Sequence, residues 1–142
     1  MIFHTQIALA TRGHTDIHDI THQAEQAVRQ SGVQQGLLTI FTASATSALT
    51  TIEFESGALA DLRHALDKIA PPDAEYQHNL RWRDGNGHSH LRAALLGPSI
   101  SVPIYQGRLT LGTWQQLIFL DFDVRARDRK LECQIMGDVV EP

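Results

Sequence analysis

Four strand-like patterns follow one another in the last part of the chain, and no helical pattern interrupts them. Short connections let consecutive strands pair antiparallel, whereas parallel pairing needs a crossover of about a dozen residues or more. The series therefore predicts a largely antiparallel sheet. Its strands are expected at Ile100–Ile104, Arg108–Leu111, Trp114–Phe122 and Arg129–Met136, with a turn at Gln106 and Gly107.

The first part of the chain mixes strand and helix patterns. Ser56–Ala70 is the clearest helix, because leucine and isoleucine recur at spacings of three and four and two prolines follow. The remaining elements are strands at Ile2–Ala10, Gly36–Thr42 and Ala48–Phe54, a helix at Asp19–Gly32 and a short helix at His90–Leu96. Together they predict an α+β fold of packed, largely antiparallel β-sheets with two or three helices.

Composition sets broad limits on the class of protein. A chain of 142 residues fits a single domain, residues 1–142, and a net charge of −4 without a basic block disfavours nucleic-acid binding. No apolar run reaches the ~20 residues of a membrane span, and the first residues lack the pattern of a secretory signal. The single cysteine, Cys133, fits a reducing cytoplasm. Its alternating surroundings favour a buried strand residue over a nucleophile.

The segment His78–His90 is the strongest candidate for a chemical site. Three of the eight histidines lie in these thirteen residues, which also contain Asp84, Asn86 and two glycines. Imidazole is the commonest metal ligand, and three protein ligands with open positions are typical of a catalytic divalent metal. We expect Asp84 and Asn86 to orient the imidazoles or to contact substrate. The predicted metal ligands are His78, His88 and His90. In the alternative interpretation, His88 or Ser89 caps a short helix, the glycines form turns and His78 is a surface residue.

Two other segments carry weaker signals. Trp114 and Gln115 follow a glycine-bracketed strand and could offer a stacking face and an amide to a small ligand, although Trp114 equally fits a core or subunit interface. Glu53 ends a β-branched strand and gains interest only if it meets the histidine segment. The hydroxyl groups of Ser44, Thr46 and Ser47 could accept a phosphate, but a polar strand edge is the simpler interpretation.

The remaining histidines and the charged run near the C-terminus are interpreted as surface features. No chemistry is assigned to His4, His14, His18, His22 and His64. The alternating charges of Asp121, Asp123, Arg125, Arg127 and Arg129 are interpreted as surface ion pairs.

Several motifs together closely resemble the YjbQ family, also called the secondary thiamine-phosphate synthase family. The resemblance extends from about Asp19 to Gly137. Its motifs are His78, Trp82-x-Asp84-Gly-Asn-Gly-His-Ser-His90, Leu95-Leu-Gly-Pro-Ser, Val102-Pro-Ile, Gly107-Arg-Leu, Leu111-Gly-Thr-Trp-Gln115, Asp121-Phe-Asp and Arg129.

This resemblance implies an α+β fold, a homotrimer, a small-molecule substrate and a divalent metal, zinc or magnesium. The implied activity joins hydroxymethylpyrimidine diphosphate to thiazole phosphate and releases pyrophosphate. The residues expected to act in catalysis are His78, His90, Glu53 and Gln115. Those expected to bind substrate are Asp84, Asn86, Trp114 and Arg81, and the cations near the site are Arg81, Arg83 and Arg92.

The chain departs from the family pattern at two positions. Many members have a histidine and an asparagine where Ser44 and Ile52 stand. If that histidine is a metal ligand, this chain has lost a ligand or uses His88 instead. The preferred hypothesis is a thiamine-phosphate synthase-like enzyme. The alternative is a non-catalytic small-molecule or metal-binding homotrimer whose synthase activity is incidental.

Overall fold

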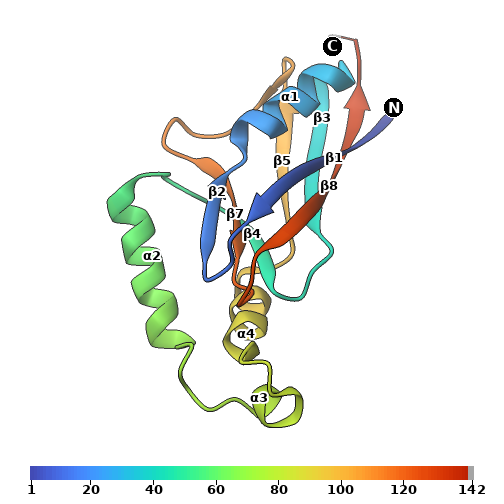
Figure 1. Cartoon of the computed structure of the whole chain (residues 1–142). Helices are drawn as coiled ribbons and strands as arrows, with labels where there is room; N and C mark the ends of the chain where they lie inside the picture. The colour runs from blue at the N-terminus through green and yellow to red at the C-terminus, as the bar shows by residue number, and fades with distance from the viewer. Residues whose placement is uncertain (141–142) are drawn as a thin grey trace.

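The computed structural model describes residues 1–140, and two antiparallel β-sheets form its centre (Figure 1). The larger sheet has the strand order β1-β8-β3-β5-β6 and the smaller one β2-β7-β4. The predicted α+β class is therefore confirmed. The strands are β1 (Ile2–Thr11), β2 (Asp16–Asp19), β3 (Gln35–Thr42), β4 (Ser47–Ile52), β5 (Ser99–Tyr105), β6 (Arg108–Leu109), β7 (Gln116–Asp121) and β8 (Arg127–Asp138).

The middle strand of the smaller sheet, β7, is buried on both faces. Side chains alternate between the faces of a strand, so Leu117 and Phe119 enter one apolar core while Ile118 and Leu120 enter another. The first core joins the inner face of the larger sheet to the helix α1 (Thr21–Ser31). The second lies between the smaller sheet and two helices later in the chain. The small sheet thus forms the middle layer.

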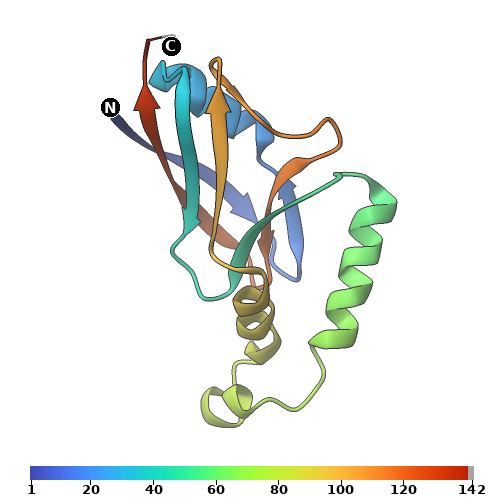
Figure 2. The same ribbon diagram turned by 180° about the vertical axis from the view of Figure 1, so that it is seen from behind.

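Those two helices are α2 (Ser56–Ile69) and α4 (Gly87–Leu96). Figure 2 shows α2 beside the smaller sheet and α4 below it, joined through a short helix, α3 (Gln77–Trp82). The structure has four helices in the described residues, one more than the upper end of the prediction, because α3 occupies a segment predicted as loop. The predicted helix at His90–Leu96 begins three residues earlier, at Gly87.

Two further expectations can be compared with the structure. Cys133 lies on β8 and is completely buried, and burial raises the pKa of its thiol to about 11, which confirms a structural rather than nucleophilic residue. Within residues 1–140, none of the helices combines the length and hydropathy needed to cross a membrane.

Candidate functional site

His78 and His90 lie side by side at the junction of α3 and α4. Their ring centroids are 4.3 Å apart, with the ring planes inclined by 40°. Oδ1 of Asp84 is 3.3 Å from Nδ1 of His78, close enough for attraction, but the angles do not make a hydrogen bond. The structure therefore brings together two of the three predicted ligands and one of the predicted polar residues.

A tight turn between the two helices produces this pairing. Arg83 ends α3 in the left-handed conformation, with φ 54°, and Gly85 follows with φ 68°. The backbone N–H of Asn86 donates to Asp84, 3.1 Å away, and fixes the turn. Gly87 then packs so closely that a Cβ atom would lie 2.5 Å from Cβ of Tyr76. The two glycines of the segment are thus required by local geometry.

His88 belongs to a different face of α4 from His90. Residues two apart on an α-helix project about 200° apart, so an i, i+2 pair does not share a side. Because residues 87–96 are helical, and neither extended nor a simple turn, His88 and His90 do not lie on one side. Burial lowers the pKa of His88, and repulsion from Arg92 lowers it further, which outweighs the opposite effect of the Gly85 carbonyl.

Three buried polar side-chain atoms have no hydrogen-bond partner in the described part of the chain. They are Nδ1 of His78, Oδ1 of Asn86 and Nδ1 of His88, all from the predicted segment. Buried polar atoms are nearly always paired, because an unpaired one costs about 1–3 kcal/mol. All three exceptions lie within residues 78–90, which makes this segment the candidate site.

A metal site is not assembled from these residues in one chain. Among residues 1–140, no three His, Cys, Asp or Glu side chains are arranged to hold an ion. The pair His78 and His90 offers two imidazoles, and Asp84 is beside only the first of them. The residues present therefore do not fit a three-ligand metal within a single chain.

A buried network of charges lies behind Asn86. The amide of Asn86 donates to Oδ1 of Asp123 at 3.3 Å, while Arg127 donates to Oδ2 of the same carboxylate at 3.0 Å. Next to it, Arg129 forms two hydrogen bonds with Asp121, of 2.7 and 2.9 Å. Asp121 is 0% exposed and Asp123 is 3% exposed. The interpretation as surface ion pairs was wrong for Asp121 and Asp123, because both carboxylates flank Phe122 at the end of the buried strand β7, whereas Arg125 is exposed as predicted.

This network also fixes the hydroxyl-rich segment. Arg129 donates to Oγ of Ser44 at 3.1 Å and to Oγ1 of Thr46 at 3.0 Å, and Thr46 donates to Asp123. Desolvation opposes ionisation of Asp123, but these donors and the charge of Arg127 hold the pKa of its carboxyl below the usual value. The hydroxyl groups are therefore engaged inside the protein and do not form a free phosphate site.

The other predicted site residues lie at the opposite end of the small sheet. Ser47 pairs with Asp121 at the α4 end of β4 and β7, and Ile52 pairs with Gln116 at the far end. Glu53 and the exposed Trp114 and Gln115 follow that far end. Five residues of strand span about 17 Å. One chain therefore does not bring Glu53, Trp114 and Gln115 to the histidines (Figure 1).

The local contacts of these residues fit that placement. Gln115 accepts from the N–H of Gly112 and donates to Thr51, at 3.1 and 3.2 Å, so it stabilises its own loop. Trp114 is 73% exposed, which excludes a place in the core of a single chain. Arg81, the predicted substrate cation, is exposed on α3 and stacks on Trp82 at 5.6 Å.

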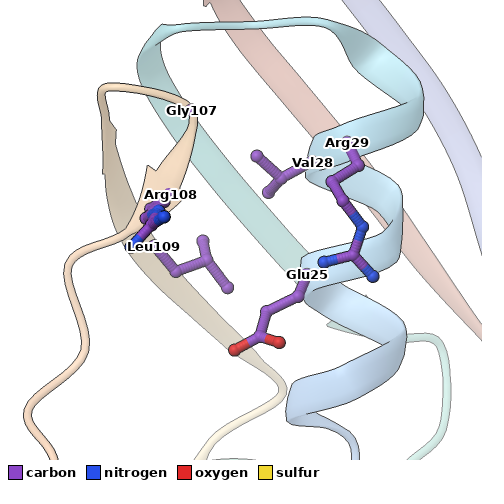
Figure 3. A pocket seen from close by; sticks show the side chains of 6 residues that line it. All are labelled: Glu25, Val28, Arg29, Gly107, Arg108 and Leu109. Carbon is purple, nitrogen blue, oxygen red and sulfur yellow. The ribbon is translucent and has the colours of Figure 1, made fainter.

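A separate cavity of about 440 Å³ lies between α1 and the β5–β6 hairpin (Figure 3). Glu25 and Arg29 face it from α1, and Arg108 and Leu109 from the hairpin. It contains none of the unpartnered buried atoms and no histidine. We therefore place the candidate site at the histidine segment and not at this cavity.

Sequence reasoning missed several residues that shape the candidate site. Asn79 accepts the N–H of Gly87 at 2.8 Å and joins α3 to α4. Asp123 and Arg129 support Asn86 and the Ser44 segment. For Asp123 the sequence signal was its position just after the apolar strand β7, a position that fits a buried carboxylate as well as an exposed one.

Comparisons with known proteins place the whole chain. A family model described as "UPF0047 protein YjbQ-like" matches residues 5–138. A UPF0047 protein from Methanothermobacter thermautotrophicus is 36% identical over 136 residues, which cover 96% of this chain and 93% of the relative. One from Archaeoglobus fulgidus is 39% identical over 118 residues, or 83% and 90% of the two chains.

Solved structures agree with this result. A YbjQ-like protein of unknown function from Sulfolobus solfataricus has a TM-score of 0.92 and 32% identity, covering 97% of this chain and 99% of its own. A yjbq/upf0047 family protein from Clostridium acetobutylicum has a TM-score of 0.85 and 34% identity, covering 93% and 99%. The family motifs, the matched residues and the shared fold lead to one conclusion: the chain belongs to the YjbQ (UPF0047) family.

Proposed function

We propose that this protein is a thiamine-phosphate synthase-like enzyme whose site centres on His78 and His90. The observation that carries the proposal is that buried polar atoms of His78 and Asn86 lack hydrogen-bond partners within residues 1–140, while the ring of His78 lies against that of His90. Such atoms are costly unless a ligand completes their hydrogen bonds. The reaction itself is taken from the family resemblance.

In that reaction a carbon–nitrogen bond forms between the pyrimidine methylene carbon and the thiazole nitrogen. The carbon–oxygen bond to the diphosphate breaks, and pyrophosphate leaves with the bonding electrons. The enzyme must hold the two partners together and stabilise the charge that develops on the leaving group. Arg81 is an exposed cation beside this site, and Trp82 offers a ring for stacking. A zinc or magnesium ion stays a prediction.

A homotrimer is part of the same proposal. The far-end residues Glu53, Trp114 and Gln115 can meet the histidines only if two subunits contribute to one site. An apolar row on the outer face of the larger sheet supports assembly: Ile2, Met136 and Leu37 are cross-strand neighbours on β1, β8 and β3 and are 66%, 50% and 41% exposed. Light scattering coupled to size exclusion measures the number of subunits.

The decisive assay measures thiamine phosphate formed from the two substrates. We expect His90→Ala to lose about a hundredfold in rate, in the range found when one positioned donor or acid–base group is removed. His64→Ala is the matched control, since His64 lies on the exposed face of α2, and its rate should be unchanged. Equal rates for wild type and His90→Ala would remove His90 from the mechanism.

Mixing variants tests the shared site. His90→Ala and Gln115→Ala subunits are each expected to be strongly impaired alone, by about a hundredfold in rate for His90→Ala. Unfolding and refolding them together should restore part of the activity, because some interfaces then combine two intact halves. Mixtures no more active than the separate variants would contradict a site made from two subunits.

A second candidate function is a non-catalytic binding protein. The observation that favours it is the engagement of Ser44, which stands where many relatives have histidine. Its hydroxyl accepts from Arg129 and from the N–H of Thr46, both at 3.1 Å, and forms part of the buried network. Metal analysis of protein purified without a chelator or affinity tag partly distinguishes the synthase-like enzyme from the non-catalytic binding protein. Stoichiometric metal without synthase activity would favour the binding protein.

A further inference from the structure

A small cavity of about 160 Å³ opens on the other side of α4 from His90. Its lining comes from three parts of the chain that are distant in sequence. They are His14 and Thr15 from the turn before β2, Arg63, Asp67 and Pro72 from α2 and the residues that follow it, and His88 and Arg92 from α4. A single water needs only about 10–15 Å³, so the cavity has room for several waters or a compact ligand.

Positive charge predominates at this cavity. Arg63 and Arg92 together outweigh the one carboxylate, Asp67, before either histidine is counted. Arg92 is 2% exposed and donates to Asp67 at 2.9 Å, to Thr15 at 2.8 Å and to the carbonyl of Ala70. Its guanidinium is thus fixed in place and keeps a buried charge at the floor of the cavity.

Arg63 has a different role at the rim. It is exposed, and its one recorded hydrogen bond runs from Nη2 to the carbonyl of Thr15, at 2.9 Å. The guanidinium has five N–H donors in a planar fork, so most of them are left to face a ligand. An arginine anchored through one nitrogen is well placed to bind an oxyanion.

His88 supplies an unpaired buried group on the same lining. It is 4% exposed, and its Nδ1 has no hydrogen-bond partner. His88 and Arg92 are four residues apart on α4 and therefore lie on one face of the helix. The imidazole of His88 therefore lines the same cavity as the guanidinium of Arg92.

The turn that completes the cavity is strained. Gly13, His14 and Thr15 have φ values of 78°, 56° and 62°, so three consecutive residues are left-handed. Such conformations cost of order 1–3 kcal/mol for residues other than glycine and persist where the surroundings enforce them. Here the N–H of His14 donates to the carbonyl of Asp123 at 2.8 Å, and both arginines donate to Thr15. The result is an imidazole, His14, at the rim of the cavity.

We propose that this cavity binds the phosphate group of a small molecule. Cationic or imidazole groups approach it from three segments, which suits a tetrahedral anion with several oxygens better than a planar carboxylate. Bidentate pairing with a guanidinium is a strong form of phosphate recognition. The proposal goes beyond the proposed function, because it requires neither the synthase reaction nor a metal and uses a different face of α4 from His90.

Calorimetric titration at constant ionic strength tests the proposal, first with inorganic phosphate and then with methyl phosphate. Saturable binding of one phosphate per chain is expected. Arg63→Gln should weaken it about tenfold or more, as loss of a hydrogen bond to a charged group implies. Lys68→Gln removes the same charge from α2 at an exposed position outside the cavity and should change the affinity less than twofold.

Each result has a definite meaning. Tighter binding of methyl phosphate identifies a phosphorylated molecule as the natural ligand, and equal binding identifies phosphate itself. Absence of saturable binding to wild type would overturn the proposal, and so would equal weakening by Arg63→Gln and Lys68→Gln. His14→Gln provides a second check from the turn before β2 and should also weaken binding. Because no turnover is measured, failure here is distinct from failure of the synthase assay.

Discussion

Removing Arg129 should destabilise the protein more than any exposed charge change. Its side chain is 14% exposed and donates to Asp121 at 2.7 and 2.9 Å, to Ser44 and to Thr46. In Arg129→Met, the carboxylate of Asp121 keeps only the hydroxyl of Thr11 and one backbone N–H, while remaining completely buried. Loss of one partner from a buried ion pair costs about 3–5 kcal/mol, out of a total stability of about 5–15 kcal/mol.

Chemical denaturation at one fixed protein concentration measures this loss, so that any change in assembly does not enter the comparison. Arg125→Gln is the matched control at an exposed position and should change the free energy of unfolding by less than about 0.5 kcal/mol. The double variant Arg129→Met with Asp121→Asn should be more stable than Arg129→Met alone, because a neutral amide needs no counter-charge. Two results would contradict a coupled buried ion pair between Arg129 and Asp121. One is a loss of unfolding free energy in Arg129→Met no larger than in Arg125→Gln. The other is a loss in the double variant equal to the sum of the losses in Arg129→Met and Asp121→Asn.

Three further outcomes follow from the same structure. The pKa of Asp123 is lowered in the folded state, so its ionised carboxylate stabilises the fold. This stabilisation is complete above the unfolded pKa of about 3.9 and is lost as the pH falls through the folded pKa. The stability difference between wild type and Asp123→Asn, measured by denaturation from pH 6 downward, should therefore shrink below about pH 4, and a constant difference would contradict this. Cys133, whose pKa is about 11, should resist a thiol reagent at pH 8 until denaturant is added, and rapid labelling of native protein would show an accessible thiolate. Gly87→Ala should lose about 1–3 kcal/mol through its clash with Tyr76, whereas Gly112→Ala, with no atom closer than 3.6 Å to the new carbon, should be nearly neutral in the same denaturation assay.

The strands were predictable because their signals are local. Alternation and short turns located β1, β3, β4, β5, β7 and β8 to within a few residues, and the three-and-four spacing located α2. The element β2 (Asp16–Asp19) was missed, because four residues with two acids and a histidine carry no alternation strong enough to read. Its strand character comes from pairing with the apolar β7, a tertiary contact absent from the local sequence.

The candidate site was predictable as a segment, but its arrangement was not. The unpartnered buried atoms lie within residues 78–90, the segment that is dense in histidine and glycine, and its role as a functional site stays a prediction. The same composition suggested a loop, and this hid α3 and the first turn of α4. Burial of Asp121 and Asp123 was equally hidden, because a charged residue after an apolar strand is indistinguishable in sequence from a solvated strand end.

Ser44 stands where the family resemblance leads us to expect a histidine. The helical conformation of residues 87–96 alters what this difference implies. In an extended segment, His88 and His90 could have joined His78 in one site, with His88 replacing the absent residue. On α4, His90 contacts His78, while His88 shares a face with Arg92 and lines the phosphate-sized cavity. Ser44 is bound to Arg129 instead. To replace that histidine, His88 would have to reach His78 as well as the cavity beside Arg92. A residue on a helix projects in one direction, so His88 does not reach both. The two histidines are therefore best treated as members of separate sites, one for the proposed chemistry and one for the proposed phosphate.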